Sequence, residues 1–124
     1  MKKTLLSIIL IFSISSHAMT VSEFEKVMKT QINYPEDMTL YFTGLMSSAL
    51  MFNALSLDMS GKRMFCSPRN KMHKVEEHIQ ITNWFITKAG ETMRSEYRKM
   101  GRNFDEIEIS EAYALALINY YSCD

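Results

Sequence analysis

The apolar positions of this chain recur every three or four residues, which is the spacing of a helix face and not of a strand. The first such set consists of Val21, Phe24, Val27, Met28 and Ile32. Thr20 and Glu23 form a capping-box pair at the start of this set. We therefore expect a first helix over residues 21–32, ended by Asn33-Tyr34-Pro35 because proline cannot continue a helix.

A second and longer apolar run begins at Pro35, a residue that suits the first turn of a helix. Its broad apolar face consists of Met38, Tyr41, Phe42, Leu45, Met46, Ala49, Phe52 and Leu55. Glycine inside a helix costs about 1 kcal/mol relative to alanine, so we expect another helix backbone to approach Gly44 closely. Because the run is so apolar, we predict that it forms the buried central helix. A loop over residues 58–63 follows it.

A third helix is predicted in the middle of the chain. Ser67 and Pro68 suit its N-cap and first position, and Gly90 suits its C-terminal cap. Its apolar stripe consists of Val75, His78, Ile79, Thr82, Phe85, Ile86 and Ala89. A weaker helical pattern covers residues 92–100 and places Met93, Tyr97 and Met100 on one side.

The last helix follows a segment without a clear period, residues 101–109. Ser110 is expected to cap this helix, which would cover residues 111–122. Its core-facing positions would be Tyr113, Ala116, Leu117 and Tyr120. No stretch of the sequence shows the alternation of a strand. The chain is therefore predicted to be all-α, a compact bundle of four to five helices.

The first 18 residues have the layout of an export signal. Two lysines precede an apolar stretch, and small residues occupy the −3 and −1 positions of a cleavage site between Ala18 and Met19. The apolar stretch is too short to span a membrane, and we expect no second stretch of spanning length after it. The prediction is a signal peptide at 1–18, a single periplasmic domain at 19–124, and no membrane contact in the mature form.

Cys66 and Cys123 are the two cysteines of the chain. Two thiols in an oxidising compartment usually form one disulfide, so we expect the bundle to be stapled by a bridge between them. Chain entropy assigns a bridge that closes a loop of this length a stabilising effect of roughly 4 kcal/mol. The bridge would tie the C-terminus back to the middle of the chain.

Composition and spacing give no support to several function classes. The chain carries 14 basic and 14 acidic residues, and loss of the two signal lysines leaves acids in excess, which does not favour nucleic-acid binding. His73 and His78 are five positions apart, whereas a helical zinc site needs a spacing of four. His73 and Glu77 have that spacing, but a solvated helix face explains them better. The methionines are scattered, which disfavours copper binding. We predict no catalytic residue, metal or cofactor, and no enzymatic activity.

Four segments carry a resemblance to a known family. They are Tyr41-Phe42-Thr43-Gly44, Phe65-Cys66-Ser67-Pro68, Asn83-Trp84-Phe85-Ile86 and the closing Tyr120-Tyr121-Ser122-Cys123 after an Ala/Leu-rich helix. In this order, over residues 38–124, the chain resembles the Tai family of immunity proteins. These are periplasmic antidotes to the peptidoglycan amidase toxins of type VI secretion systems.

The resemblance implies a protein without catalysis that docks on a cognate peptidoglycan amidase effector and blocks its active-site cleft, with a homodimer as a possible state. We take residues 90–109 as the presenting loop, where bases would meet an acidic cleft and aromatics would anchor. The candidate contact residues are Arg94, Tyr97, Arg98, Lys99, Arg102, Asn103 and Phe104. The other interpretation is that the apolar members pack on the bundle and the bases are solvated.

A small periplasmic stress chaperone with one disulfide is the alternative function. Such a protein also joins two distant cysteines and has no catalytic residues. It would bind many clients through apolar surface, and abundant methionine suits such contacts because its side chain is flexible and polarisable.

Overall fold

The computed structural model describes residues 18–30, 33–68 and 71–124; the predicted signal peptide, except Ala18, lies outside the described residues. The described chain forms α2 (Val21–Thr30), α3 (Glu36–Ser60), α4 (Val75–Lys99), the short 3-10 helix η1 (Phe104–Glu106) and α5 (Ile109–Tyr120). Extended pairing among these residues is limited to one bridge between Thr20 and Glu108. The all-α class and the Cys66–Cys123 disulfide are both confirmed.

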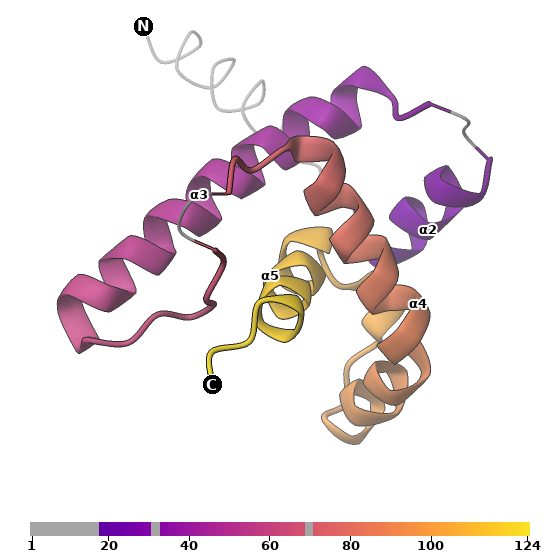
Figure 1. The fold of residues 1–124 in the computed structure, drawn as a ribbon. Coiled ribbons are helices and arrows are strands. Elements are labelled where there is room, and N and C mark those ends of the chain that lie inside the picture. Colours follow the sequence, from indigo (N-terminus) through magenta and orange to yellow (C-terminus); the bar gives the residue numbers. More distant parts are fainter. Residues whose placement is uncertain (1–17, 31–32, 69–70) are drawn as a thin grey trace, which may run out of the picture.

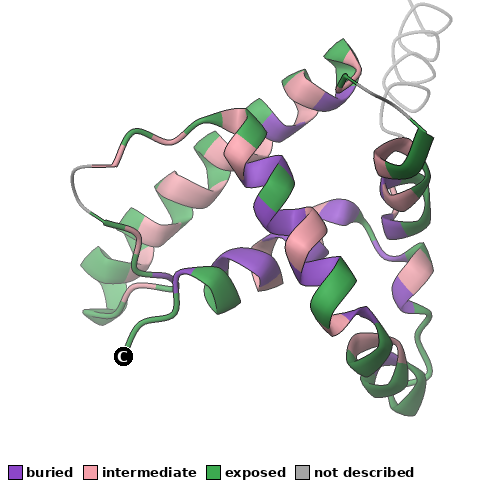
Figure 2. Cartoon of the chain, turned by 45° about the vertical axis from the view of Figure 1, so that its right-hand side comes forward, coloured by how far each residue is buried: buried purple, intermediate pink, exposed green. Residues whose placement is uncertain are grey.

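The core lies where α4 and α5 pack together, and α3 runs past them as one long rod (Figure 1). Figure 2 shows the buried residues gathered around this crossing. α2 and η1 pack against one another and close one end of the bundle. An aromatic chain joins the parts, because the Phe42 ring on α3 lies 5.7 Å from both Phe24 on α2 and Tyr113 on α5.

Local signals explain how α2 and α5 are placed. The Glu23 amide donates to the Thr20 hydroxyl at 3.2 Å, as the capping pair predicts. The Ile109 amide donates to the Met19 carbonyl at 2.7 Å, which ties the start of α5 to the start of α2. Ser110 was expected to cap a helix that starts at residue 111, but α5 begins two residues earlier at Ile109, with Glu108 as its N-cap.

The prediction that the second apolar run is the buried central helix is wrong. Met38 and Phe42, both in the first two turns, are the buried residues of α3. Nothing lies within 4 Å of a Cβ placed on Gly44, so the expected close helix approach is absent from the described residues. A helix with apolar residues on several sides shows no clearly preferred face. Here the first two turns contribute the buried residues, while Leu45, Ala49 and Leu50 pack against the core partly buried.

The predicted limits of the third helix are also wrong. Ser67 and Pro68 belong to a segment without regular structure, and α4 begins at Val75. The helix then passes through Gly90 without a break. It ends at Lys99, and the φ of 74° at Gly101 allows the Arg102 amide to donate to the Tyr97 carbonyl at 2.8 Å, as in a Schellman motif. Residues 92–99 are therefore the last part of α4 rather than a presenting loop.

Candidate docking surface

α3 exposes large apolar side chains along most of its length, and we call this surface the α3 face. Phe52 is 58% exposed and Met59 is 86% exposed. The members of the α3 face are Leu40, Met51, Phe52, Leu55, Leu57 and Met59. Several exposed large apolar side chains on one helix of a small protein indicate an interaction surface.

α3 is also long and apolar enough to cross a membrane, judged by length and composition alone. The expectation that no second stretch of spanning length follows the signal is therefore wrong. Two turns of the helix contribute buried residues to the core, and Glu36, Asp37 and Asp58 lie near its ends.

A small apolar groove separates the C-terminal half of α3 from α5, and we call it the α3–α5 groove. Its volume is about 160 Å³. A cavity of about this size accommodates a benzene molecule, so one apolar side chain of a partner fits here. The groove is lined by Ala49, Phe52, Met64, Phe65, Ala114, Leu117 and Ile118. The wall formed by Phe52 belongs to the α3 face, which makes the two surfaces continuous.

Polar contacts fix the wall of the groove that follows α3. The Asn53 side chain accepts from the amides of Met64 at 2.8 Å and Phe65 at 3.1 Å, and it donates to the Phe65 carbonyl at 2.9 Å. The Cys66 amide then donates to the Tyr121 carbonyl. The Cys66–Cys123 disulfide joins the same two segments of the chain. Met64 and Phe65 are thus held against α5 although α3 itself is little buried there.

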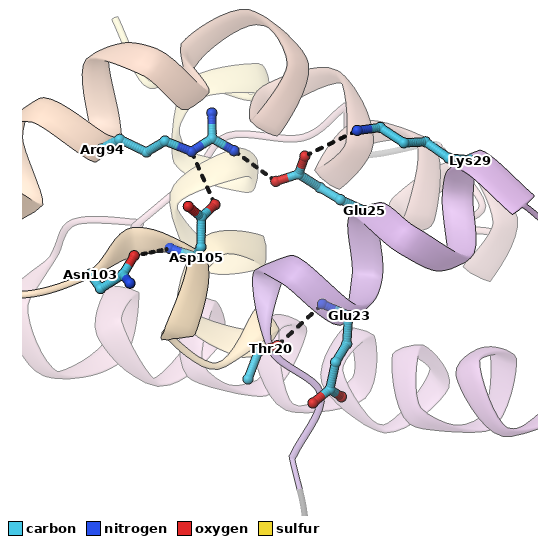
Figure 3. A network of polar contacts seen from close by, with 7 residues as sticks. All are labelled: Thr20, Glu23, Glu25, Lys29, Arg94, Asn103 and Asp105. Atoms are coloured by element: carbon cyan, nitrogen blue, oxygen red, sulfur yellow. Dashed lines mark hydrogen bonds and ion pairs between the residues drawn. The ribbon is translucent and has the colours of Figure 1, made fainter.

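Arg94, the first of the sequence-predicted contact residues, is a structural tether. Figure 3 shows its guanidinium between α2 and η1. Its Nη2 lies 2.8 Å from Glu25 Oε1, and its Nε lies 3.0 Å from Asp105 Oδ1. A Cβ on Gly90 would lie 3.1 Å from Arg94 Nη1, so the glycine leaves room for this guanidinium. The function of Gly90 is therefore packing rather than helix termination.

Tyr97 and Phe104 are buried and do not offer aromatic anchors to a partner in this structure. Their rings lie 5.3 Å apart in an edge-on arrangement. The Tyr97 hydroxyl donates to Glu111 at 2.9 Å, and burial followed by this bond raises the pKa of Tyr97. Arg102 pairs with Glu111 and lies over the Tyr97 ring. This part of the candidate set follows the core-packing interpretation.

The remaining candidates, Arg98, Lys99 and Asn103, are exposed. Lys99 pairs with Glu96 along α4, and the Asn103 side chain accepts from the Asp105 amide at 3.0 Å. The structure brings these side chains to the end of α4 but forms no groove of apolar character around them.

The sequence analysis missed a series of buried, hydrogen-bonded polar side chains. His78 is fully buried, and its two ring nitrogens lie 2.7 Å from the Tyr113 hydroxyl and 2.9 Å from His73. The helical spacing argument failed because His73 precedes α4 and is not on it. The placement of His78 on the apolar stripe was the available signal for its burial.

Within the described residues, no group of three or more histidine, cysteine or acidic side chains could hold a metal ion. Comparison of the chain with protein-family models, with curated proteins and with solved structures found no match.

Proposed function

We propose that this chain is a periplasmic immunity protein that docks on a peptidoglycan amidase through the α3 face and the α3–α5 groove. The observation that carries the proposal is the exposure of Phe52, an aromatic side chain that forms a wall of an apolar groove. Aromatic side chains at such grooves commonly dominate the free energy of protein association. The identity of the partner rests on the resemblance to the Tai family.

Two basic residues adjoin the groove along the chain and would suit an acidic cleft. Lys62 and Arg63 directly precede the groove residue Met64, and α3 itself contains no basic residue. A basic rim beside an apolar centre would speed encounter with an acidic cleft and fix the orientation of the complex. A second candidate contact surface lies at the C-terminal end of α4 and consists of Arg98, Lys99, Arg102 and Asn103.

The test uses the exported, oxidised protein and the amidase encoded by a neighbouring gene. Binding is measured by isothermal titration calorimetry, and inhibition is measured as amidase turnover of peptidoglycan. We expect Phe52→Ala to weaken binding at least tenfold and to relieve inhibition. The matched control is Met100→Ala, which truncates another exposed apolar side chain outside the α3 face and should leave both values unchanged.

The outcomes separate the surfaces and the partners. Loss of binding in Arg98→Glu with normal binding in Phe52→Ala would place the contact at the end of α4 and refute the assigned surface. No complex at micromolar concentrations would reject the immunity function. Association with anionic vesicles, or a dimer that Phe52→Ala dissociates in light scattering, would show that a lipid surface or a second copy covers the α3 face instead.

A stress chaperone is the second candidate, and one observation favours it. Met51, Met59, Met64 and Met72 are all exposed large apolar side chains. Flexible thioethers adapt to many partners. If the chain suppresses the aggregation of unrelated unfolded clients at stoichiometric amounts, and binds the amidase no more tightly than those clients, this function replaces the first.

A further inference from the structure

A chain of hydrogen bonds crosses the interior and ends at the segment before α4. His78 Nδ1 lies 2.7 Å from the Tyr113 hydroxyl, and His78 Nε2 lies 2.9 Å from Nδ1 of His73. The second ring nitrogen of His73 lies 3.4 Å from the Ser67 hydroxyl. The chain therefore joins α5, α4 and residues 71–74 through two imidazole rings.

The bond between the rings depends on how many protons they carry. A neutral imidazole has one N–H and one bare nitrogen, whereas an imidazolium has two N–H groups. The bond survives with no added proton or with one, because the neutral ring changes tautomer. When both rings are protonated, two N–H groups and two positive charges face each other across 2.9 Å, and the bond is lost.

The charged groups around the pair do not neutralise a second proton. Glu77 on α4 is already paired with Lys71. Lys71 adds a positive charge of its own, and its ammonium lies over the Tyr121 ring of the C-terminal turn. From α5, the Tyr113 hydroxyl faces the pair, and burial raises the pKa of Tyr113. The site therefore contains no free carboxylate among the groups that face it from these elements.

The direction of the pH effect follows from the buried ring. Burial, followed by the charge of His73, lowers the pKa of His78 to about 4, and Glu77 opposes the shift. In an unfolded chain the same residue binds a proton below about pH 6.5. Because the unfolded state holds more protons between these values, the folding equilibrium weakens as the pH falls from 6.5 to 4 and levels off below that. The full difference corresponds to about 300-fold in the folding equilibrium constant.

We propose that His73 and His78 form a proton-sensitive latch that holds residues 71–74 against α4 and α5 at neutral pH and releases them in mild acid. Release leaves the Lys71–Glu77 ion pair and the Lys74 carbonyl, which accepts from the amides of Glu77 and His78, as polar ties of this segment to α4, and it exposes the His78 ring that bonds Tyr113. The latch lies apart from the α3 face, so the inference does not depend on the proposed partner.

The test measures hydrogen exchange by mass spectrometry on the exported, oxidised protein from pH 7 to pH 4.5, with rates corrected for intrinsic exchange. We expect protection of residues 71–80 to fall at least tenfold over this range, and by more than the protection of α5, whose core amides report the global folding equilibrium. In His73→Gln burial still lowers the pKa of His78, but the charge of His73 is gone and a polar partner for His78 remains, so the loss of protection should be smaller than in the wild type. The matched control is Lys74→Gln, an exposed change in the same segment, which should follow the wild type.

A wild-type acid response that persists unchanged in His73→Gln would overturn the latch, as would uniform protection of residues 71–80 across the pH range. A second measurement applies even if a variant fails to fold. Loss of the predicted signal peptide removes His17, so the exported protein contains two histidines whose imidazole nitrogen signals can be followed separately. A pKa near 6.5 for both rings would refute the shared-proton arrangement.

Discussion

Removal of the disulfide should loosen the α3–α5 groove before it loosens the core. The bridge joins cysteines 57 positions apart, and chain entropy gives such a loop a stabilising effect of about 4 kcal/mol. The buried residues of α3 lie in its first two turns, so the second half of the helix is positioned by the chain that follows it. That chain is anchored by the disulfide and by Asn53.

The perturbation is the double variant Cys66→Ala/Cys123→Ala. Its free energy of unfolding in urea should be about 4 kcal/mol lower than that of the oxidised wild type, and its melting temperature should fall by roughly 15 °C or more. Phe65 stays partly anchored because its ring lies 6.4 Å from that of Tyr121 and because Asn53 bonds its backbone. We therefore expect local loosening in the folded state as well as a global loss of stability.

Hydrogen exchange shows which part loosens. Protection should fall in residues 50–66 and hold in the middle of α5 around Tyr113, where α4 and α5 pack. The matched control is Ser122→Ala, an exposed neighbour of Cys123, which should behave as the wild type. A stability change below about 1 kcal/mol, or an equal loss of protection in α5, would show that the bridge does not position the groove.

Two further pairs of substitutions test the fold. Arg94→Met should lower the free energy of unfolding by about 1 kcal/mol because it removes the partly exposed ion pairs to α2 and η1. The control Arg98→Met should change this free energy by less than about 0.5 kcal/mol. Equal values for the two variants in urea unfolding would contradict the role of Arg94 as a tether. Gly44→Ala should raise the free energy of unfolding by up to about 1 kcal/mol, since it adds a methyl group to an open helix surface. Gly101→Ala should lower it by a similar amount, because the backbone φ of Gly101 is 74°. The melting temperatures of the two variants should therefore shift in opposite directions.

Features set by neighbouring residues were predictable from the sequence. The Thr20–Glu23 cap and the apolar spacing placed α2 within two residues at each end of its observed range, Val21–Thr30. The apolar stripe of α4 was also correct, since Ile79, Phe85 and others on it are buried. The disulfide was predictable from the expected export signal and the number of cysteines, which need no knowledge of the fold.

Features that depend on distant partners were not predictable. Gly90 carries the usual signal for the end of a helix, but the helix continues through it, and Arg94 uses the space that the glycine leaves. Tyr97 and Phe104 were candidate anchors because they lie among bases in sequence, and they are buried because η1 folds back on α4. The bonds of His78 to both His73 and Tyr113 required the packing of α5 across α4.

The exposure of α3 and the position of the disulfide are two parts of one arrangement. A helix whose second half is only partly buried, through Ala49 and Leu50, gains less from packing, and isolated helices are marginal in water. The disulfide and the three bonds of Asn53 supply the missing restraint, because they hold Met64 and Phe65 beside α5. The result is an apolar surface that is ordered without being buried. A surface already ordered in this way loses less conformational entropy when a partner binds than a flexible one does. By ordering this surface in advance, the disulfide lowers the entropy cost of docking at the α3–α5 groove, and this effect is independent of which partner would occupy the groove.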